Sequence, residues 1–318
     1  MKAIMKCMRR YSIALLMLPV FGSAQAQTYP AKPITILVGL AAGGTVDTVG
    51  RVYASQIEKK WKQAAIVENR PGAGGLLAFR GLVRAPADGY TVVMGASPTQ
   101  VLWVKDPGYA YEDLLVASVV GVSRYGLMAS KSLNVTNLAE FIKYAKANPS
   151  RMNFGVIPAS AHEMEVRSAL SIFGIEGTII PYKGTPEIYT ALLSGVLSAT
   201  IHSGSPQVQS GQVLALAMAG DKRPPEMPNV PTFRELGFNY NPGANFVLYV
   251  RTGTARSIVE KLAEESAIMA KSEEFLARIT KPYSIIGLGL PHDASVKYMS
   301  DEYIRMKNVV DLFGIKPQ

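Results

Sequence analysis

The sequence predicts an α/β fold built from largely parallel sheets with helices on both faces. Short apolar runs typical of strands alternate along the chain with longer segments whose apolar residues recur at helical spacing. This βαβ alternation places parallel strands in a sheet that helices cover. A third observation is length, because a chain of 318 residues can bury a substantial hydrophobic core.

The strands are predicted from apolar runs, the first of which, residues 34–38, has the pattern of a strand buried in a sheet. The predicted strands are residues 34–38, 65–68, 91–95, 115–122, 152–156, 178–181, 199–202 and 213–219. Ligands bind at the carboxyl ends of strands in such sheets. The loops expected to carry a site are therefore 39–47, 96–100, 157–162, 182–186 and 202–206.

The helices are predicted from amphipathic spacing and from their stop signals. Residues 137–148 end before Pro149, which cannot continue a helix. The last helix has one apolar face, formed by Val296, Met299, Tyr303, Met306 and Val310. The predicted helices are residues 45–61, 76–84, 137–148, 163–173, 187–194, 255–269, 273–279 and 294–313.

Residues 1–26 have the pattern of a secretory signal peptide. Four basic residues precede an apolar run at 13–21, and small residues end at Ala26, after which cleavage is expected. A membrane anchor is the alternative, but the run is about half the ~20 residues that a spanning helix needs. Cys7 is the only cysteine and precedes the apolar run, so disulfides and cysteine-based metal sites are excluded from the exported chain. We expect a periplasmic protein.

The formal charge of +9 includes the four basic residues of the signal, so the exported chain carries about +5. The basic residues are scattered, without the clustered Lys and Arg and interleaved aromatics of a nucleic-acid surface, and no nucleic-acid partner is expected. This excess of positive charge would mildly favour small anionic ligands, and a role in solubility explains it equally well.

The segment VGLAAGGTVDTVGR, Val38 to Arg51, joins a strand end to a helix start. Gly43 and Gly44 let the backbone approach a ligand, and Thr45 or Asp47 can cap the helix. Free N–H groups and the positive dipole end would then suit a carboxylate or phosphate. An ordinary capped turn explains the pattern equally well. No Lys follows the glycines, which excludes a P-loop.

The segment VENRPGAGGLLAFRG, residues 67–81, has three glycines in four residues ahead of a helix. It does not match a dinucleotide fingerprint, because its strand is short, Pro71 interrupts the turn, and no acidic residue lies where a ribose partner should be. These glycines are predicted to form a tight turn against which a helix packs closely.

Catalytic patterns are weak. His162, His202 and His292 are not four residues apart, so no metal site is indicated, and no cofactor is expected. Serines follow His202, but no G-x-S-x-G elbow is present. A hydrogen-bonded or ligand-contacting histidine is favoured, and we do not expect an enzyme.

Several segments that occur together in one order indicate a family. They are YPAKPITILVG, AAGGTVDTVGR, VENRPGAGGLLAFRGLVRAPADGYTVVMGASPT, IIPYKGTPE, GQVLALAMAGDKRPPEMPNVPTFRELGF and VRTGTARSIVEKL. On these, the chain resembles the Bug-type extracytoplasmic solute receptors, the substrate-binding proteins of tripartite tricarboxylate transporters. The resemblance covers essentially the whole chain after the signal.

The resemblance implies a two-lobed periplasmic binding protein, monomeric, that closes on a small organic carboxylate and delivers it to membrane permease subunits. Lobe 1 would comprise residues 27–124 and 247–318, and lobe 2 residues 125–246. The chain would cross between them near 122–127 and 244–250. The RPGAGG segment would be structural or would line the cleft.

The resemblance also implies ligand contacts from the segments GGTVD, GASPT, VIPASAHEM and PYKG. Tyr182 and Phe246 could add an apolar wall if the ligand is aromatic, and core or hinge packing is the alternative for both rings, favoured for Phe246. A solvated loop charge is the alternative for Lys183. The implied binding residues are Gly43, Gly44, Thr45, Asp47, Ser97, Thr99, Ser160, Ala161, His162, Tyr182, Lys183, Gly184, His202 and Ser203.

Three departures from the family pattern affect this site. Residues 39–42 replace the usual prolines, VIPASA lacks the usual Gly-x-Gly-Thr run, and Ser198 and His202 stand at usually acidic positions. A carboxylate at these positions can bind the ammonium group of an amino-acid ligand. His202 cannot do so, and we therefore expect a ligand without an ammonium group. Two other classes stay open: a sensor that signals ligand occupancy, and a serine hydrolase that uses His202 with Ser203 or Ser205.

Overall fold

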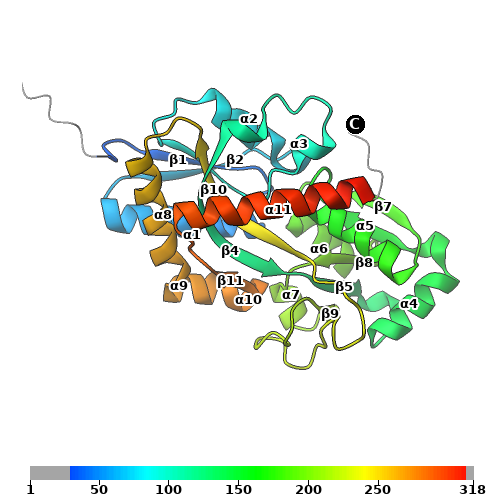
Figure 1. Ribbon diagram of the computed structural model, residues 1–318. Helices are drawn as coiled ribbons and strands as arrows, with labels where there is room; N and C mark the ends of the chain where they lie inside the picture. Colours follow the sequence, from blue (N-terminus) through cyan, green and yellow to red (C-terminus); the bar gives the residue numbers. More distant parts are fainter. Residues whose placement is uncertain (1–28, 313–318) are drawn as a thin grey trace, which may run out of the picture.

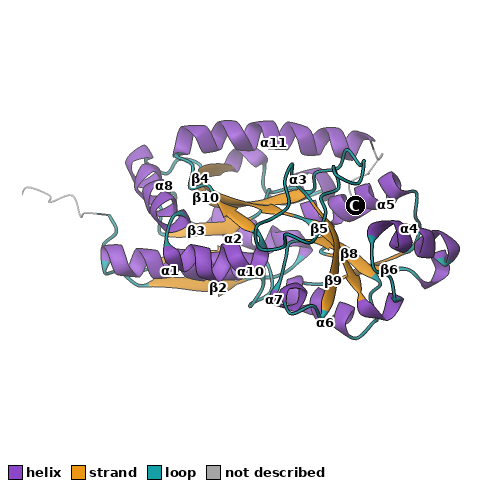
Figure 2. Cartoon of the chain, turned by 90° about the horizontal axis from the view of Figure 1, so that it is seen from below, coloured by secondary structure: helices purple, strands orange, loops and turns teal. Residues whose placement is uncertain are grey.

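The computed structural model describes residues 29–312, which form two helix-flanked sheets side by side (Figures 1 and 2). We call the six-stranded sheet with its helices lobe 1, and the five-stranded sheet with its helices lobe 2. The predicted signal peptide and Cys7 lie outside the described residues.

The sheet of lobe 1 has the strand order β11-β4-β10-β3-β1-β2. β1 pairs in parallel with β2 and β3, whereas β10 is antiparallel to β3 and β4, and β11 is antiparallel to β4. Its strands are β1 (Ile34–Val38), β2 (Ala65–Asn69), β3 (Thr91–Gly95), β4 (Leu114–Arg124), β10 (Gly243–Arg251) and β11 (Ile285–Gly287).

Helices cover both faces of this sheet. The apolar residues of α1 and α8 belong to one core cluster, and those of α2 share another with Met299 of α11. The helices of lobe 1 are α1 (Thr45–Trp61), α2 (Leu76–Arg84), α3 (Gln100–Trp103), α8 (Arg256–Ala270), α9 (Glu273–Phe275), α10 (Lys281–Tyr283) and α11 (His292–Leu312).

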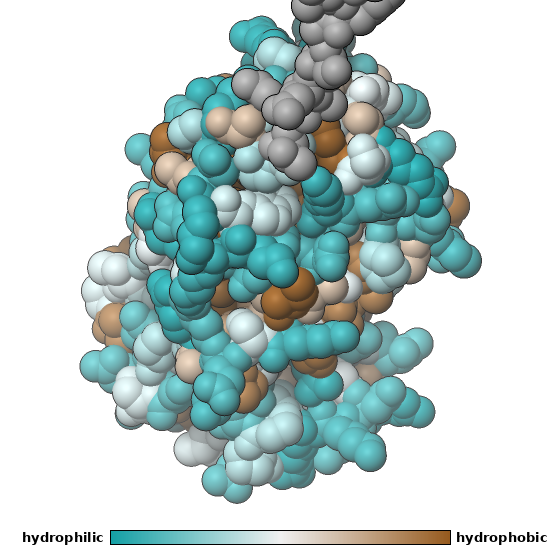
Figure 3. Space-filling view, turned by 90° about the vertical axis from the view of Figure 1, so that its left-hand side faces the viewer, coloured by the Kyte–Doolittle hydropathy of each residue, from teal (hydrophilic) through white to brown (hydrophobic). Residues whose placement is uncertain are grey.

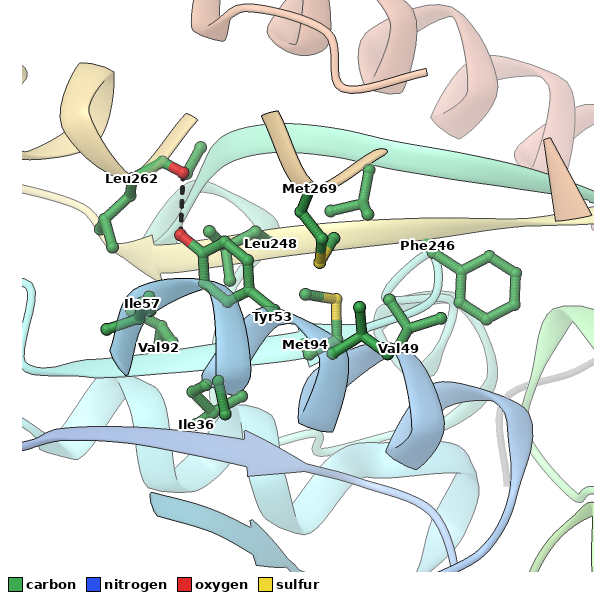
Figure 4. Close-up of a cluster of buried hydrophobic side chains, with 14 of the residues drawn as sticks. Ile36, Val49, Tyr53, Ile57, Val92, Met94, Phe246, Leu248, Leu262 and Met269 are labelled. Carbon is green, nitrogen blue, oxygen red and sulfur yellow. Dashed lines mark hydrogen bonds between the residues drawn. The ribbon is translucent and has the colours of Figure 1, made fainter. Parts of the chain in front are cut away.

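The core between α1, α8 and the sheet is shown in Figure 4. Tyr53 is fully buried, and its hydroxyl donates to the carbonyl oxygen of Leu262 at 2.8 Å, so the ring packs without an unpaired polar atom. Ile36 and Leu248 are likewise fully buried. Each such side chain stabilises the fold by about 1.5–3 kcal/mol relative to exposure. Phe246 lies at one end of this cluster.

Lobe 2 has the strand order β7-β6-β8-β5-β9. β6 pairs in parallel with β7 and β8, and β5 is antiparallel to β8 and β9. Its elements are β5 (Gly126–Ser130), β6 (Asn153–Val156), β7 (Thr178–Pro181), β8 (Ala199–His202), β9 (Val213–Met218), α4 (Leu138–Ala147), α5 (Ala161–Phe173), α6 (Thr185–Leu193) and α7 (Pro206–Gln209).

The α/β class and all the predicted strands and helices are confirmed within a few residues at their ends. The sheets are more mixed than βαβ alternation predicts, because three strands that the sequence analysis did not identify, β5, β10 and β11, run antiparallel to their neighbours. Of these, β5 and β10 start where the chain passes from one lobe to the other. The direction of these two strands therefore depends on the direction in which the chain enters the lobe, and not on a helical crossover.

Three segments connect the lobes. β4 is followed by β5 after Tyr125 alone, and β10 begins beside the end of β4, with Gly243 opposite Arg124. α11 extends from lobe 1 over lobe 2 (Figure 1). There, Met306 belongs to the same apolar cluster as Met164 of α5. The two chain crossings and α11 thus lie around the space between the lobes.

The outer end of lobe 1 is mainly hydrophilic, with hydrophobic side chains in small groups (Figure 3). Within residues 29–312, none of the helices combines the length and the hydropathy that a bilayer crossing requires.

Candidate ligand-binding site

A cavity lies between the two lobes. Its volume is about 50 Å³, counted as the space open to the centres of water molecules. All five loops that the sequence analysis singled out contribute to it. The lining comprises Gly39, Leu40, Thr45, Val46, Gly74, Gly75, Ala78, Phe79, Val93, Gly95, Ala96, Ser97, Tyr125, Ile157, Ser160, Ala161, His162, Thr185, His202, Ser203, Ala244, Asn245 and Phe246.

Three helices begin at this cavity. The first residues of α1, α5 and α6, which are Thr45, Ala161 and Thr185, all line it. The Thr45 and Thr185 hydroxyl oxygens lie 3.5 Å apart across the two lobes. Because the first N–H groups of a helix have no intrahelical partner, three sets of backbone donors face one small volume. Such termini bind anions.

The loops before these three helices are fixed by the same type of hydrogen bond. A carboxylate in the first turn accepts a hydrogen bond from the backbone N–H four residues earlier: Gly43 to Asp47 at 2.9 Å, Ala159 to Glu163 at 3.0 Å, and Lys183 to Glu187 at 2.9 Å. These carboxylates satisfy a donor outside the helix and leave the N–H groups of the first turn available to the cavity.

Asp47 is buried, and both of its carboxylate oxygens accept hydrogen bonds. Its Oδ2 also accepts from Arg51 Nε at 2.9 Å, and its Oδ1 accepts from Asn69 Nδ2 at 2.9 Å. Burial opposes ionisation, but the hydrogen bonds from Arg51, Gly43 and Asn69 outweigh it, so the pKa of Asp47 lies below its ordinary value. The carboxylate fixes the shape of the loop and is absent from the cavity lining.

His202 is a neutral donor in this site. Its Nδ1 accepts the backbone N–H of Ser203 at 2.9 Å, which requires the proton on Nε2. Nε2 lies 3.2 Å from the Thr185 hydroxyl and therefore donates to it. Burial lowers the pKa of His202 to about 4, so the ring is uncharged at neutral pH.

His162 has the same tautomer for the same reason. Its Nδ1 accepts the Ile157 N–H at 2.9 Å, and Nε2 lies 3.1 Å from the hydroxyl of Thr200. Burial, and next the neighbouring His202, hold the pKa of His162 well below its ordinary value. The two rings lie 4.9 Å apart, and Tyr125 stacks on His202 at 5.3 Å. This packing fixes both imidazoles.

The His202–Ser203 pair lacks the features of a hydrolase. The Ser203 hydroxyl lies 3.1 Å from His202 Nδ1, but that nitrogen already accepts a backbone N–H, and the other nitrogen meets Thr185 where a triad has a carboxylate. An imidazole with a pKa of about 4 is also a weak general base at neutral pH.

The structure divides the predicted binding residues into two groups. Those that line the cavity are Thr45, Ser97, Ser160, Ala161, His162, His202 and Ser203. Those that are absent from its lining are Gly43, Gly44, Asp47, Thr99, Tyr182, Lys183 and Gly184.

The second group borders the cavity or joins the lobes. Tyr182 and Lys183 line a depression beside the cavity, and both hollows share Gly74 and Ile157. The Thr99 hydroxyl donates to the Ala159 carbonyl at 3.5 Å, across the lobes. Gly184 also lies at the lobe boundary, where a Cβ on it would approach the Cβ of Ala41 to 2.9 Å.

Several lining residues, Thr185 among them, were not among the predicted binding residues. Gly75, Ala78 and Phe79 belong to the glycine-rich turn and to α2, for which a structural or cleft-lining role was left open. Tyr125 and Asn245 lie where the chain crosses between the lobes. The expected crossings were the one signal that could have identified them.

Among the described residues, no three His, Cys, Asp or Glu side chains come together as a metal site. The polar groups around the cavity are hydroxyls, neutral imidazoles and the backbone N–H groups of the helix N-termini.

Two helix-flanked lobes that enclose a cavity at converging helix N-termini define a two-lobed solute-binding protein. The sequence model of the "Tripartite tricarboxylate transporter family receptor" matches residues 49–308. The chain belongs to this family of periplasmic solute receptors.

Individual relatives support this assignment. The chain is 34% identical over 281 residues to the Cupriavidus necator "UPF0065 protein in gbd 5'region", which covers 82% of each chain. It is 30% identical over 310 residues to "Protein BugT" of Bordetella pertussis, covering 92% of each. A solved structure described as "R. palustris Rpa4515 with adipate" superposes with a TM-score of 0.86 at 26% identity, covering 91% of this chain and 100% of that one.

Proposed function

We propose that this protein binds a small organic carboxylate in the interlobe cavity and delivers it to the membrane permease of a tripartite tricarboxylate-type transporter. The observation that carries the proposal is the convergence of α1, α5 and α6 on one cavity. A carboxylate there would accept several backbone hydrogen bonds, and the helix dipoles would favour its charge. The adipate named for the R. palustris structure supports this chemistry.

The proposal includes the parts of the chain that serve this role. Export would remove residues 1–26 and leave a periplasmic monomer. Lobe 1 would comprise 27–124 and 247–318, and lobe 2 residues 125–246, except that β10 begins at Gly243 in the sheet of lobe 1. The binding cycle would include no catalytic step. The direct contacts would come from the predicted residues that line the cavity. Those outside the lining, among them Gly43, Asp47 and Gly184, would shape its loops.

Two features of the cavity argue against an amino-acid ligand. An ammonium group needs an acceptor, commonly a carboxylate, and no carboxylate is present in the lining. His202 and His162 direct their Nε2–H groups at hydroxyls, and their Nδ1 lone pairs are already used. An amino acid would bury its ammonium group without an ionic partner, which costs several kcal/mol.

The first test is a thermal-shift screen. The full-length chain is expressed, purified from the periplasm, unfolded and refolded to remove retained ligand, and screened against carboxylates, amino acids, amines and sugars. A carboxylate at one hundred times its Kd should stabilise the protein by about 2.7 kcal/mol. Stabilisation by amines or sugars, with none by carboxylates, contradicts the proposal.

Delivery to a permease is tested separately by uptake. Cells that lack this protein should lose uptake of the labelled carboxylate and regain it on complementation. Unchanged uptake together with a changed transcriptional response to the ligand would favour the sensor instead.

A further inference from the structure

We infer that the second half of α11, residues 302–312, is a strap between the lobes that packs on α5 in the closed form and so positions the N-terminus of α5 at the cavity. The side chains that carry this role are Met306 and Val310, which are absent from the cavity lining. This inference rests on the proposed function, because it names residues that act on the same site from outside it.

The first half of α11 is fixed to lobe 1. The Ser295 hydroxyl accepts the backbone N–H of Val119 in β4 at 2.9 Å. His292 Nδ1 lies 2.8 Å from the carbonyl oxygen of Val116 in the same strand. Met299 is buried in a cluster that belongs to lobe 1 alone. Because α11 is one continuous helix of 21 residues, the strap keeps its position relative to lobe 1.

The strap covers α5 of lobe 2 (Figure 1). Met306 and Val310 are buried in one apolar cluster with Ala161 and Met164 of α5. The two side chains are four residues apart, so they lie on the same face of α11. Part of their burial comes from the other lobe. Opening the lobes would therefore expose apolar surface to water, which is unfavourable.

A polar contact lies beside this cluster. The carboxyl group of Glu165 in α5 is buried, and its Oε1 lies 3.6 Å from Nη2 of Arg305. Glu302 orients Arg305, because its two carboxylate oxygens accept from Nε at 2.8 Å and from Nη2 at 2.9 Å. Burial raises the pKa of Glu165 to about 7, so the pair is only partly ionised at neutral pH. The apolar cluster therefore carries most of the contact.

The strap acts on the end of α5 that faces the ligand. Ala161, the first residue of α5, belongs to the apolar cluster and also lines the cavity. Its neighbours Ser160 and His162 line the cavity as well. One turn of helix thus separates the strap from the space for the ligand. Loss of the strap would free one of the helix N-termini that converge there.

The contact depends on the angle between the lobes. At the angle of this structure, Gly74 and Thr99 of lobe 1 also approach the carbonyl oxygen of Ala159, just before α5. A rigid helix fixed to lobe 1 cannot follow α5 when lobe 2 rotates away, so the strap stabilises the closed form alone. Losing it lowers the population of the closed form, which weakens the binding of every ligand by the same factor.

The test compares Met306→Ala with Met299→Ala. Both variants remove a buried methionine side chain from α11, but Met299 packs within lobe 1 alone. Calorimetry on the refolded product of the full-length chain measures Kd for adipate and for benzoate. We expect Met306→Ala to weaken both probes by the same factor, about fivefold, and Met299→Ala to change neither by more than about twofold. Val310→Ala, which removes less of the side chain, should act in the same direction as Met306→Ala.

The angle between the lobes is measured separately. Spin labels on Lys60→Cys in lobe 1 and Lys146→Cys in lobe 2, both exposed positions, report the interlobe distance in a Cys7→Ser background. The distance is recorded with and without adipate. We expect a smaller closed fraction in Met306→Ala than in Met299→Ala.

The outcomes separate this inference from the proposed function. Equal closed fractions in the two variants overturn the strap, and so do unequal losses of affinity for adipate and benzoate, which would indicate direct contact with the ligand. A smaller closed fraction in Met306→Ala, in a protein that binds neither these acids nor any other carboxylate, supports the strap and overturns the proposed function.

Discussion

Gly74 of lobe 1 lies directly against the backbone of Ala159 in lobe 2. A Cβ on Gly74 would lie 2.6 Å from the Ala159 carbonyl oxygen and 2.8 Å from that of Pro158. The φ angle of Gly74 is 64°, in the left-handed region. The position therefore requires glycine both for its conformation and for the close approach of the lobes. This contact closes one side of the cavity.

Replacing Gly74 by alanine should hold the lobes apart. We expect G74A to weaken ligand binding at least tenfold, since backbone atoms must move to admit the methyl group. Gly211, with φ of 68° and no atom within 4 Å of a built Cβ, is the matched control for backbone strain. Both variants should lose about 1 kcal/mol of stability, but only G74A should lose affinity. Equal affinities by calorimetry would show that this contact does not limit closure.

The Thr185 hydroxyl should contribute to affinity. It accepts the His202 Nε2–H and lies beside Thr45, so its removal leaves a buried donor unpaired and disturbs the place where α1 and α6 meet. We expect T185V to weaken carboxylate binding about tenfold and to lower stability by about 1–3 kcal/mol. Thr190→Val, on the exposed side of the same helix, is the control. Unchanged Kd in T185V would remove Thr185 from the site.

Affinity for a carboxylate should not depend on pH between 6 and 8. His202 has a pKa of about 4 and His162 one well below its ordinary value, so neither ring gains a proton in this range. The helix N-termini do not titrate. Calorimetry at pH 6, 7 and 8 should give Kd values within about twofold. A tenfold gain in affinity at pH 6 would mean that a histidinium binds the anion.

Glu165 of α5 should make stability fall as pH rises. Burial raises its pKa to about 7, even though Arg305 of α11 lies 3.6 Å away and lowers it. The folded state therefore holds a proton that the unfolded state releases near pH 4.5, and stability is lost between about pH 4.5 and 7.

Glu165→Gln removes this proton linkage, so the stability of E165Q relative to the natural chain should rise from pH 5 to pH 8. The gain should not exceed about 3 kcal/mol. Urea unfolding at both pH values measures it, and the comparison cancels the contribution of the histidines. A difference that stays constant with pH contradicts the raised pKa.

The five ligand-facing loops could be predicted from the sequence because a general rule governs them. Ligands bind at the carboxyl ends of parallel strands, and those strands are local apolar runs. β10 could not be identified as a central strand by this route, because its antiparallel partners β3 and β4 are distant in sequence. For the same reason Tyr125 and Asn245 were not predicted to line the cavity.

Side-chain roles were harder to predict than backbone positions. Asp47 was placed in the correct loop, but its three hydrogen-bond donors come from Gly43, Arg51 and Asn69, and Asn69 lies in another strand. The tautomer of His202 likewise depends on one backbone N–H. A sequence pattern gives the residue type at such a position, but not the number of partners that tertiary packing provides.

The crossing segments have a mechanical consequence. β4 and β10 lie side by side where they leave lobe 1, and the residues that follow or begin them, Tyr125, Ala244 and Asn245, are also cavity wall. Flexing of this two-stranded ribbon therefore changes the walls that touch the bound molecule. The fit of the ligand and the angle between the lobes therefore change together. A partner protein that detects this angle would thereby detect whether the ligand is bound.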